Sequence, residues 1–157
     1  MIGLGASALY AGDDVKGEHL ALAEQVTNAA GTTVWVASED LLDAVTAVSG
    51  SGPAYFFALI EAIARAGAEL GLDEKVAMSL TLQTAMGAAA LAQQSDDGVA
   101  KLRENVTSPG GTTEQALLSL QSNQFEAIVS EAVRQCAARA AALGLSLIHI
   151  SEPTRHR

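Results

Sequence analysis

The sequence from Ser38 to about Leu143 is a succession of alanine-rich segments, separated by short breaks that carry glycine, proline, serine or aspartate. Alanine has the highest helix propensity, and its small side chain lets neighbouring helices approach closely. Hydrophobic residues make up 49% of the 157 residues but aromatic residues only 4%, which is typical of closely packed helices. This part of the chain is therefore predicted to be an all-helical bundle.

Start and stop signals divide the bundle into individual helices. Pro53 lies at a first helical position, Gly71 follows the end of the same helix, and Asp73 is placed to cap the next one. The acids at Glu39 and Asp40 favour an earlier helix N-terminus. The predicted helices are 38–48, 53–71, 73–94, 99–106, 113–120 and about 125–143.

The first third of the chain has a different pattern. A short apolar run at 6–11 predicts a strand, Asp13 or Asp14 can cap a helix to about Ala30, and the β-branched and aromatic residues at 32–36 predict a second strand. These elements form a β-α-β unit. Because two strands alone leave edges and faces uncovered, we expect the unit to be the end of a larger α/β domain.

One motif at the start of the chain imitates a nucleotide-binding loop. Gly3-Leu4-Gly5-Ala6-Ser7-Ala8 has the G-x-G-x-x-A spelling of a dinucleotide loop, in which glycines let the backbone reach a pyrophosphate. Such a loop must follow a strand, and only two residues precede this one. We therefore interpret the segment as the first predicted strand itself.

Charge and composition exclude several classes of partner. With 9 basic and 18 acidic residues the net charge is −9, and no basic cluster is present to neutralise nucleic-acid phosphates. The single cysteine, Cys136, fits a reducing compartment, and the three histidines have no metal-ligand spacing, so no metal site is expected. No secretory signal is apparent, so the expected location is cytoplasmic.

An uncharged stretch at 76–95 is nearly long enough to cross a bilayer. It contains several serine, threonine and glutamine residues and has no flanking aromatic belt, so a membrane span is not expected. We interpret it as a helix buried on most sides, with a subunit interface as its cover.

The break at 107–113, Thr-Ser-Pro-Gly-Gly-Thr-Thr, leads directly into a predicted helix. The first N–H groups of a helix have no partner within it, and the peptide dipoles add about half a positive charge there. A small carboxylate could therefore bind without an arginine. The alternative is an ordinary turn, in which serine, threonine and glycine serve only for capping.

Other candidate features have equally simple structural explanations. The break at 49–53 resembles the later one in chemistry, but it also suits a tight helix start. Glu39 and Asp43, four residues apart, could form an acid/base pair or be solvated. Cys136 is expected to be a small core residue, and the aromatic run 55–57 to be core or interface.

Three segments, in this order and spacing, resemble the pyrroline-5-carboxylate reductase family. They are Asp-Leu-Leu-Asp-Ala-Val at 40–45, Ser-Gly-Ser-Gly-Pro-Ala-Tyr at 49–55, and Glu-Asn-Val-Thr-Ser-Pro-Gly-Gly-Thr-Thr-Glu-Gln-Ala-Leu at 104–117. The resemblance covers roughly residues 6–143. It implies hydride transfer from NADPH or NADH to the C=N bond of 1-pyrroline-5-carboxylate, which gives L-proline in the last step of proline biosynthesis.

The resemblance also implies a domain organisation. Residues 1–37 would be the remnant of an NAD(P)-binding Rossmann domain, whose dinucleotide loop would lie upstream of Met1. Residues 38–145 would be an all-helical dimerisation and substrate-binding domain, and 146–157, which abandons the alanine-rich pattern, a non-native tail such as adapter sequence read as protein. The expected fold is mainly α, a helical dimerisation bundle preceded by a β-α-β remnant.

By the same resemblance the enzyme is a homodimer that often assembles further, and this fragment alone is expected to be inactive. The family pattern assigns the substrate carboxylate to Ser108, Gly110, Gly111, Thr112 and Thr113. It places the Thr113 hydroxyl near the ring nitrogen, as a catalytic group or as an orienting one with water as the proton donor.

The family pattern places Asn105 against the nicotinamide carboxamide, as the cofactor-binding residue, and Glu39 near the substrate. The alternative function is a non-catalytic helical dimerisation module, in which the loop at 107–113 is only a turn.

Overall fold

The computed structural model describes residues 3–151, with side chains as far as Gly144. These residues fall into two compact units, one comprising residues 3–53 and 130–151 and the other residues 54–129. This division does not follow the predicted domain boundaries at 37/38 and 145/146, which stay predictions.

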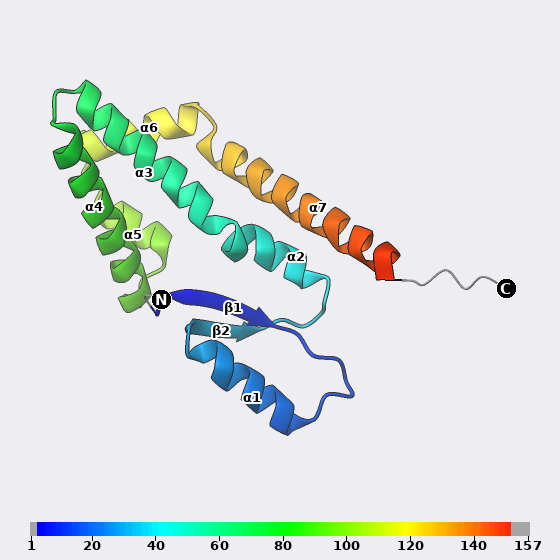
Figure 1. Cartoon of the computed structure of the whole chain (residues 1–157). Coiled ribbons are helices and arrows are strands. Elements are labelled where there is room, and N and C mark those ends of the chain that lie inside the picture. Colours follow the sequence, from blue (N-terminus) through cyan, green and yellow to red (C-terminus); the bar gives the residue numbers. More distant parts are fainter. Residues whose placement is uncertain (1–2, 152–157) are drawn as a thin grey trace. The chain divides into compact units, whose positions relative to one another are not determined.

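The first unit opens with a β-α-β unit, as predicted. Strand β1 (Gly5–Leu9), helix α1 (Gly17–Asn28) and strand β2 (Gly31–Trp35) follow each other, and the two strands pair in parallel (Figure 1). Side chains of α1 and β2 are joined by hydrogen bonds, since Thr33 Oγ1 donates to Thr27 Oγ1 at 2.8 Å and Trp35 Nε1 donates to Glu24 Oε2 at 3.1 Å.

Helix α1 begins later than the sequence predicted. Its N-cap residue is Lys16, which makes no side-chain capping bond, so the predicted cap at Asp13 or Asp14 is wrong. The N–H of Val15 donates to the carbonyl of Gly12 at 3.1 Å, and this turn holds both aspartates before the helix starts.

Gly31, which follows the predicted helix to about Ala30 and precedes the predicted strand at 32–36, is the first residue of β2. Its φ is +154°, and a Cβ there would collide with the backbone oxygen and nitrogen of Gly5. Only glycine lets the two strands begin this close together.

The predicted break at 49–53 is not a loop. Helix α2 (Leu41–Val45) continues as a π-helical turn, η1 (Thr46–Gly50), and only Ser51 separates this turn from helix α3 (Gly52–Glu69). The N–H of Ser51 reaches back five residues to the carbonyl of Thr46 at 2.8 Å, which is the hydrogen bond of a π-helix. The chain therefore stays helical through both glycines of the motif.

The signals that join α3 to helix α4 (Glu74–Gln94) were predicted correctly. Gly71 has a φ of +102°, and the N–H of Leu72 donates to the carbonyl of Gly67 at 3.1 Å, as in a Schellman motif. Asp73 then caps α4, because its Oδ1 accepts the N–H groups of Lys75 and Val76 at 2.9 and 3.3 Å.

Helices α5 (Val99–Asn105), α6 (Thr112–Ser122) and α7 (Phe125–Ser151) complete the chain, close to the predicted ranges. Helix α7 continues beyond Leu143, where the alanine-rich pattern ends, and so includes 146–151 of the predicted tail. Residues 152–157, the rest of that tail, lie outside the described residues.

Few side chains are buried within the described chain. The buried hydrophobic residues are Ala47, Ala64 and Ala77, and the buried polar residue is Thr81, whose hydroxyl donates to the carbonyl of Ala77 at 2.8 Å. The helix at 76–95 was expected to be buried by a subunit interface, and this stays a prediction, since most of its residues are exposed within the described chain. Large apolar side chains of α4 are about half exposed, namely Leu80, Leu82, Met86 and Leu91.

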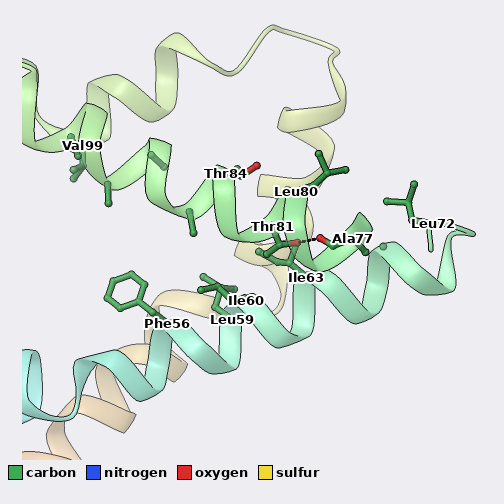
Figure 2. A pocket seen from close by; sticks show the side chains of 15 residues that line it. Phe56, Leu59, Ile60, Ile63, Leu72, Ala77, Leu80, Thr81, Thr84 and Val99 are labelled. Atoms are coloured by element: carbon green, nitrogen blue, oxygen red, sulfur yellow. Dashed lines mark hydrogen bonds between the residues drawn. The ribbon is translucent and has the colours of Figure 1, made fainter. Parts of the chain in front are cut away.

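Apolar side chains of α3 and α4 face a groove of about 640 Å³ between these two helices (Figure 2). The close approach of the helices at one end depends on Gly67, where a Cβ would lie 3.3 Å from that of Ala77. Larger side chains line the rest of the groove, among them Phe56 and Ile60 of α3, Leu80 of α4 and Val99 at the start of α5.

The helical run 41–69 is long and apolar enough to pass for a membrane span, with a mean hydropathy of 1.3. The uncharged stretch at 76–95, in α4, was considered as a membrane span from its sequence, but among the described residues α4 does not meet the criterion of length and hydropathy. A single run that meets a test of length and composition is weak support for a membrane helix.

Candidate active site

The candidate site is the 106–111 loop, which joins α5 to α6, together with the first turn of α6. Gly110 has a φ of +71°, which reverses the chain, and the N–H of Gly111 donates to the carbonyl of Ser108 at 2.9 Å. A Cβ on Gly111 would lie 2.9 Å from that carbonyl oxygen. The tight turn therefore requires glycine at both positions, as the glycine pair suggested.

The N-terminus of α6 presents open hydrogen-bond donors. Gly111 is the N-cap residue, and because it has no side chain it cannot accept the N–H groups of the first turn. Among the described residues, the N–H groups of Thr112, Thr113 and Glu114 have no acceptor. Together with the helix dipole, these groups can bind one carboxylate.

Glu114 is a residue of this site that the sequence analysis missed. Its Oε2 accepts the N–H of Gly110 at 2.7 Å, so the side chain reaches back across the turn. The spacing of an N-cap and a glutamate three residues later is that of a capping box and could have found it. The signal was hidden because the N-cap residue is glycine rather than serine or threonine.

The hydroxyls of the site differ in burial and in bonding. Ser108 and Thr112 are exposed and Thr113 is half-buried, and none of their hydroxyls makes a hydrogen bond among the described residues. Thr107, which precedes them, is committed to structure, since its Oγ1 donates to the carbonyl of Arg103 at 2.6 Å. The Thr113 hydroxyl thus stays available to a ligand.

The remaining predicted site residues lie elsewhere. Asn105 is the last residue of α5, two positions before Thr107 and in the same unit, and it is exposed. Glu39 is exposed and belongs to the other unit. It precedes α2, which begins at Leu41, so Glu39 and Asp43 are not a pair on one helix face.

The first glycine-bearing break is occupied by structural contacts. The Ser49 hydroxyl donates to the carbonyl of Ala6 in β1 at 3.2 Å, and the half-buried thiol of Cys136 in α7 donates to the Ser51 hydroxyl at 3.2 Å. Cys136 was expected to be a core residue, but it is only half-buried, with its thiol bonded within the first unit. These contacts join three parts of the first unit.

The described residues do not form a dinucleotide site. Gly5, Ala6, Ser7 and Ala8 of the G-x-G-x-x-A spelling lie within β1, which confirms that this segment is a strand. The connection from β1 to α1 carries Asp13 and Asp14, whose charges would repel a pyrophosphate. Among the described residues, no group of three potential ligands is placed to hold a metal ion.

Residues 39–143 match the family described as pyrroline-5-carboxylate reductase dimerisation. The pyrroline-5-carboxylate reductase of Pseudomonas aeruginosa is 50% identical over 143 residues, which are 91% of this chain and 52% of that protein. The Synechocystis enzyme of the same name is 41% identical over 91% of this chain and 53% of its own length. The chain thus spans about half the length of the curated relatives that it matches.

Solved structures agree. A pyrroline-5-carboxylate reductase from Coxiella burnetii is 42% identical with a TM-score of 0.87, over 90% of this chain and 53% of that one. The Plasmodium falciparum enzyme, solved with NADP bound, is 32% identical with a TM-score of 0.84, over 91% of this chain and 54% of that one. The mainly helical fold with its short β-α-β unit, and the signature around the 106–111 loop, have the same explanation: the chain belongs to the pyrroline-5-carboxylate reductase family.

Proposed function

We propose that this chain supplies the substrate-binding and dimerising half of a reductase that converts 1-pyrroline-5-carboxylate to L-proline. The observation that carries the proposal is the set of open N–H groups at Thr112, Thr113 and Glu114, within the region that matches the family. The substrate has one carboxylate, and this helix N-terminus binds one such group without a basic side chain.

The residues of the loop divide the work of binding. The N–H groups of Thr112 and Thr113 hold the carboxylate, and the exposed Ser108 hydroxyl adds a further donor. Gly110 and Gly111 shape the turn, and the N–H of Gly111 is already bound to the Ser108 carbonyl at 2.9 Å. The backbone contribution therefore falls on the two threonines more than on the glycines.

Thr113 is the candidate catalytic residue. Reduction adds a hydride to the imine carbon and leaves a proton on the ring nitrogen, and a protonated imine is the better hydride acceptor. The Thr113 hydroxyl is half-buried one residue into α6, next to the carboxylate-binding N–H groups, so it can orient the ring nitrogen. As a neutral hydroxyl without an adjacent base, it orients while water exchanges the proton.

NADPH or NADH supplies the hydride, and we propose that the half of the relatives that this chain does not span binds it. The described residues do not fit a pyrophosphate, so their part is limited to the nicotinamide end. Asn105, exposed at the end of α5, is proposed to contact the carboxamide, and Glu39 to lie near the substrate.

We further propose that the chain is a homodimer, with the α3–α4 groove as part of the interface. The support is the match to a dimerisation family and the exposure of large side chains, 66% for Phe56 and 56% for Leu80. Covering apolar area of this kind is what stabilises obligate dimers. A soluble cytoplasmic enzyme with no nucleic-acid or membrane partner is consistent with its net charge of −9 and single thiol.

The test is a hybrid reductase, in which the N-terminal half of the Pseudomonas aeruginosa relative precedes this chain. We expect the hybrid to oxidise NADPH or NADH when 1-pyrroline-5-carboxylate is added, measured as loss of absorbance of the reduced nucleotide. The 157-residue chain alone should be inactive. A folded, dimeric hybrid without activity would favour the non-catalytic dimerisation module.

The interface is tested on the 157-residue chain by light scattering. Leu80→Lys places a charge in the groove and should convert the dimer to monomer or aggregate. Lys75→Ala, outside the residues that line the groove, is the matched control and should leave the dimer intact. A dimer that tolerates Leu80→Lys would show that the groove is not part of the interface.

A further inference from the structure

We propose that Glu114 is a positioning residue for the substrate carboxylate, acting through the backbone of Gly110. The inference rests on the proposed function of the 106–111 loop. Glu114 lies within the 104–117 segment but was not assigned a role from the sequence. Its negative charge alone would not predict a place beside a site that binds a carboxylate.

Glu114 accepts a different N–H group from the one that a capping box uses. In a usual capping box the N-cap side chain accepts an N–H of the first turn, and the glutamate accepts the N–H of the N-cap residue. Here the N-cap Gly111 has no side chain, and the N–H of Gly111 is bound to the Ser108 carbonyl at 2.9 Å. Glu114 accepts the N–H one residue earlier, at Gly110.

The consequence is a division of the donors at this helix start. The two N–H groups before the helix, at Gly110 and Gly111, are satisfied within the protein. The three that follow, at Thr112, Thr113 and Glu114, are left open. Glu114 therefore satisfies the turn without closing the donors that the substrate needs.

The bond from the Gly110 N–H to Glu114 favours the backbone conformation of Gly110. Gly110 has a φ of +71°, and nothing lies within 4 Å of the position that a Cβ would take, so no packing contact at that position fixes this residue. Glycine samples several backbone regions almost equally well. The 2.7 Å bond that the N–H of Gly110 donates to the charged Glu114 carboxylate favours one of them, beside the turn bond from Gly111 to Ser108.

The charge of Glu114 weakens binding of the substrate carboxylate, whereas its hydrogen bond to Gly110 favours binding. A carboxylate within one helical turn of the binding N–H groups repels the substrate carboxylate, while its hydrogen bond orders the loop that binds it. Glutamine keeps an acceptor of the same length and removes the charge, and alanine removes both. The two variants therefore separate positioning from electrostatic repulsion.

The kinetic test uses the hybrid reductase. Glu114→Ala should raise KM for 1-pyrroline-5-carboxylate about fivefold, which corresponds to the roughly 1 kcal/mol of a capping bond, with KM for the nucleotide unchanged. Glu114→Gln should restore KM to the parent value or below it. Glu126→Ala, in the first turn of α7 and without a side-chain hydrogen bond in the described chain, is the matched control and should match the parent.

A second measurement is independent of activity. In the 157-residue chain, amide hydrogen exchange at Gly110 should become about tenfold faster in Glu114→Ala and stay slow in Glu114→Gln. Unchanged exchange in the alanine variant, or an unchanged KM in an active hybrid, would overturn the role of Glu114. An inactive parent hybrid would count against the proposed function itself, so the two failures are distinguishable.

Discussion

The two glycine-bearing breaks have similar compositions and different structures. In the first, Ser49 to Pro53, the chain passes through a π-helical turn, and both serine hydroxyls are bonded within the protein. In the second, the 106–111 loop, Gly110 reverses the chain and the next helix starts with open N–H groups. A segment rich in serine, glycine and proline leaves its hydrogen-bond donors open only where no other part of the chain accepts them, and for the first break those partners lie far away in sequence.

The largest expected effect is at Gly111. Gly111→Ala places a Cβ 2.9 Å from the Ser108 carbonyl oxygen, so the turn must shift. Because misplacing a bound group by about 1 Å can cost about 100-fold in rate, kcat/KM of the hybrid should fall by about that factor. The matched control is Gly98→Ala, at the N-cap of α5 with nothing within 4 Å, which should have little effect. Equal activity of the two variants would show that the close contact at Gly111 does not control the activity of the hybrid.

The next effect is at the Thr113 hydroxyl. Thr113→Val keeps the shape of the side chain and removes the hydroxyl, so kcat of the hybrid should fall about tenfold, less than the roughly 100-fold or more typical of a lost general acid. Thr113→Ser should retain most of the parent kcat. A loss in Thr113→Val of about 1,000-fold would instead identify the hydroxyl as the proton donor.

The serines of the two breaks should respond in opposite ways. Ser51→Ala removes the acceptor of the Cys136 thiol and should lower the free energy of unfolding by about 1 kcal/mol, with KM unchanged. Ser108→Ala should leave stability within about 0.5 kcal/mol, because its hydroxyl is exposed and unbonded in the described chain, and raise KM about two- to fivefold. Urea denaturation and kinetics of both variants, at one protein concentration, check this. A raised KM in Ser51→Ala would contradict the purely structural role expected for Ser51.

The smallest effect is a pH dependence at Glu131, which lies in neither break. Its pKa is lowered from the ordinary value of a glutamate, first by a hydrogen bond from Gln135 and then by the guanidinium of Arg134, although the side chain is exposed. A depressed pKa stabilises the fold above the unfolded value, and this contribution is lost as pH falls through the folded one. Glu131→Gln should therefore make stability fall slightly less between pH 5 and 3, measured by urea titrations. An unchanged slope would show that the pKa of this glutamate does not differ between the folded and unfolded states.

The local signals were read correctly from the sequence. Gly71 and Asp73 act within a few residues of their positions, so propensity and capping rules were sufficient to place the ends of α3 and the start of α4. The same holds for the glycine pair of the loop. The β-α-β unit was also predicted, because β-branched residues in a short run favour a strand.

The misses depend on contacts over long sequence distances or on a partner. The bond from Ser49 to Ala6 spans 43 residues and that from Cys136 to Ser51 spans 85, so no local rule predicts the π-helical turn. The exposed apolar side chains of α4 leave its predicted cover by a subunit interface as a prediction, because composition alone does not tell which residues of a partner provide it. Glu114 was missed because capping rules expect a side chain at the N-cap.

The adjacent glycines at 110 and 111 are needed for opposite reasons. Gly110 has ample space but the wrong handedness for an L-residue, with φ at +71°, whereas Gly111 has an ordinary φ of −85° but no space. A D-alanine introduced at 110 by chemical synthesis should thus preserve the loop, whereas L-alanine at 111 should distort it. Chirality restricts one position and volume the other, so this dipeptide tolerates none of the amino acids that a single codon change can offer without loss.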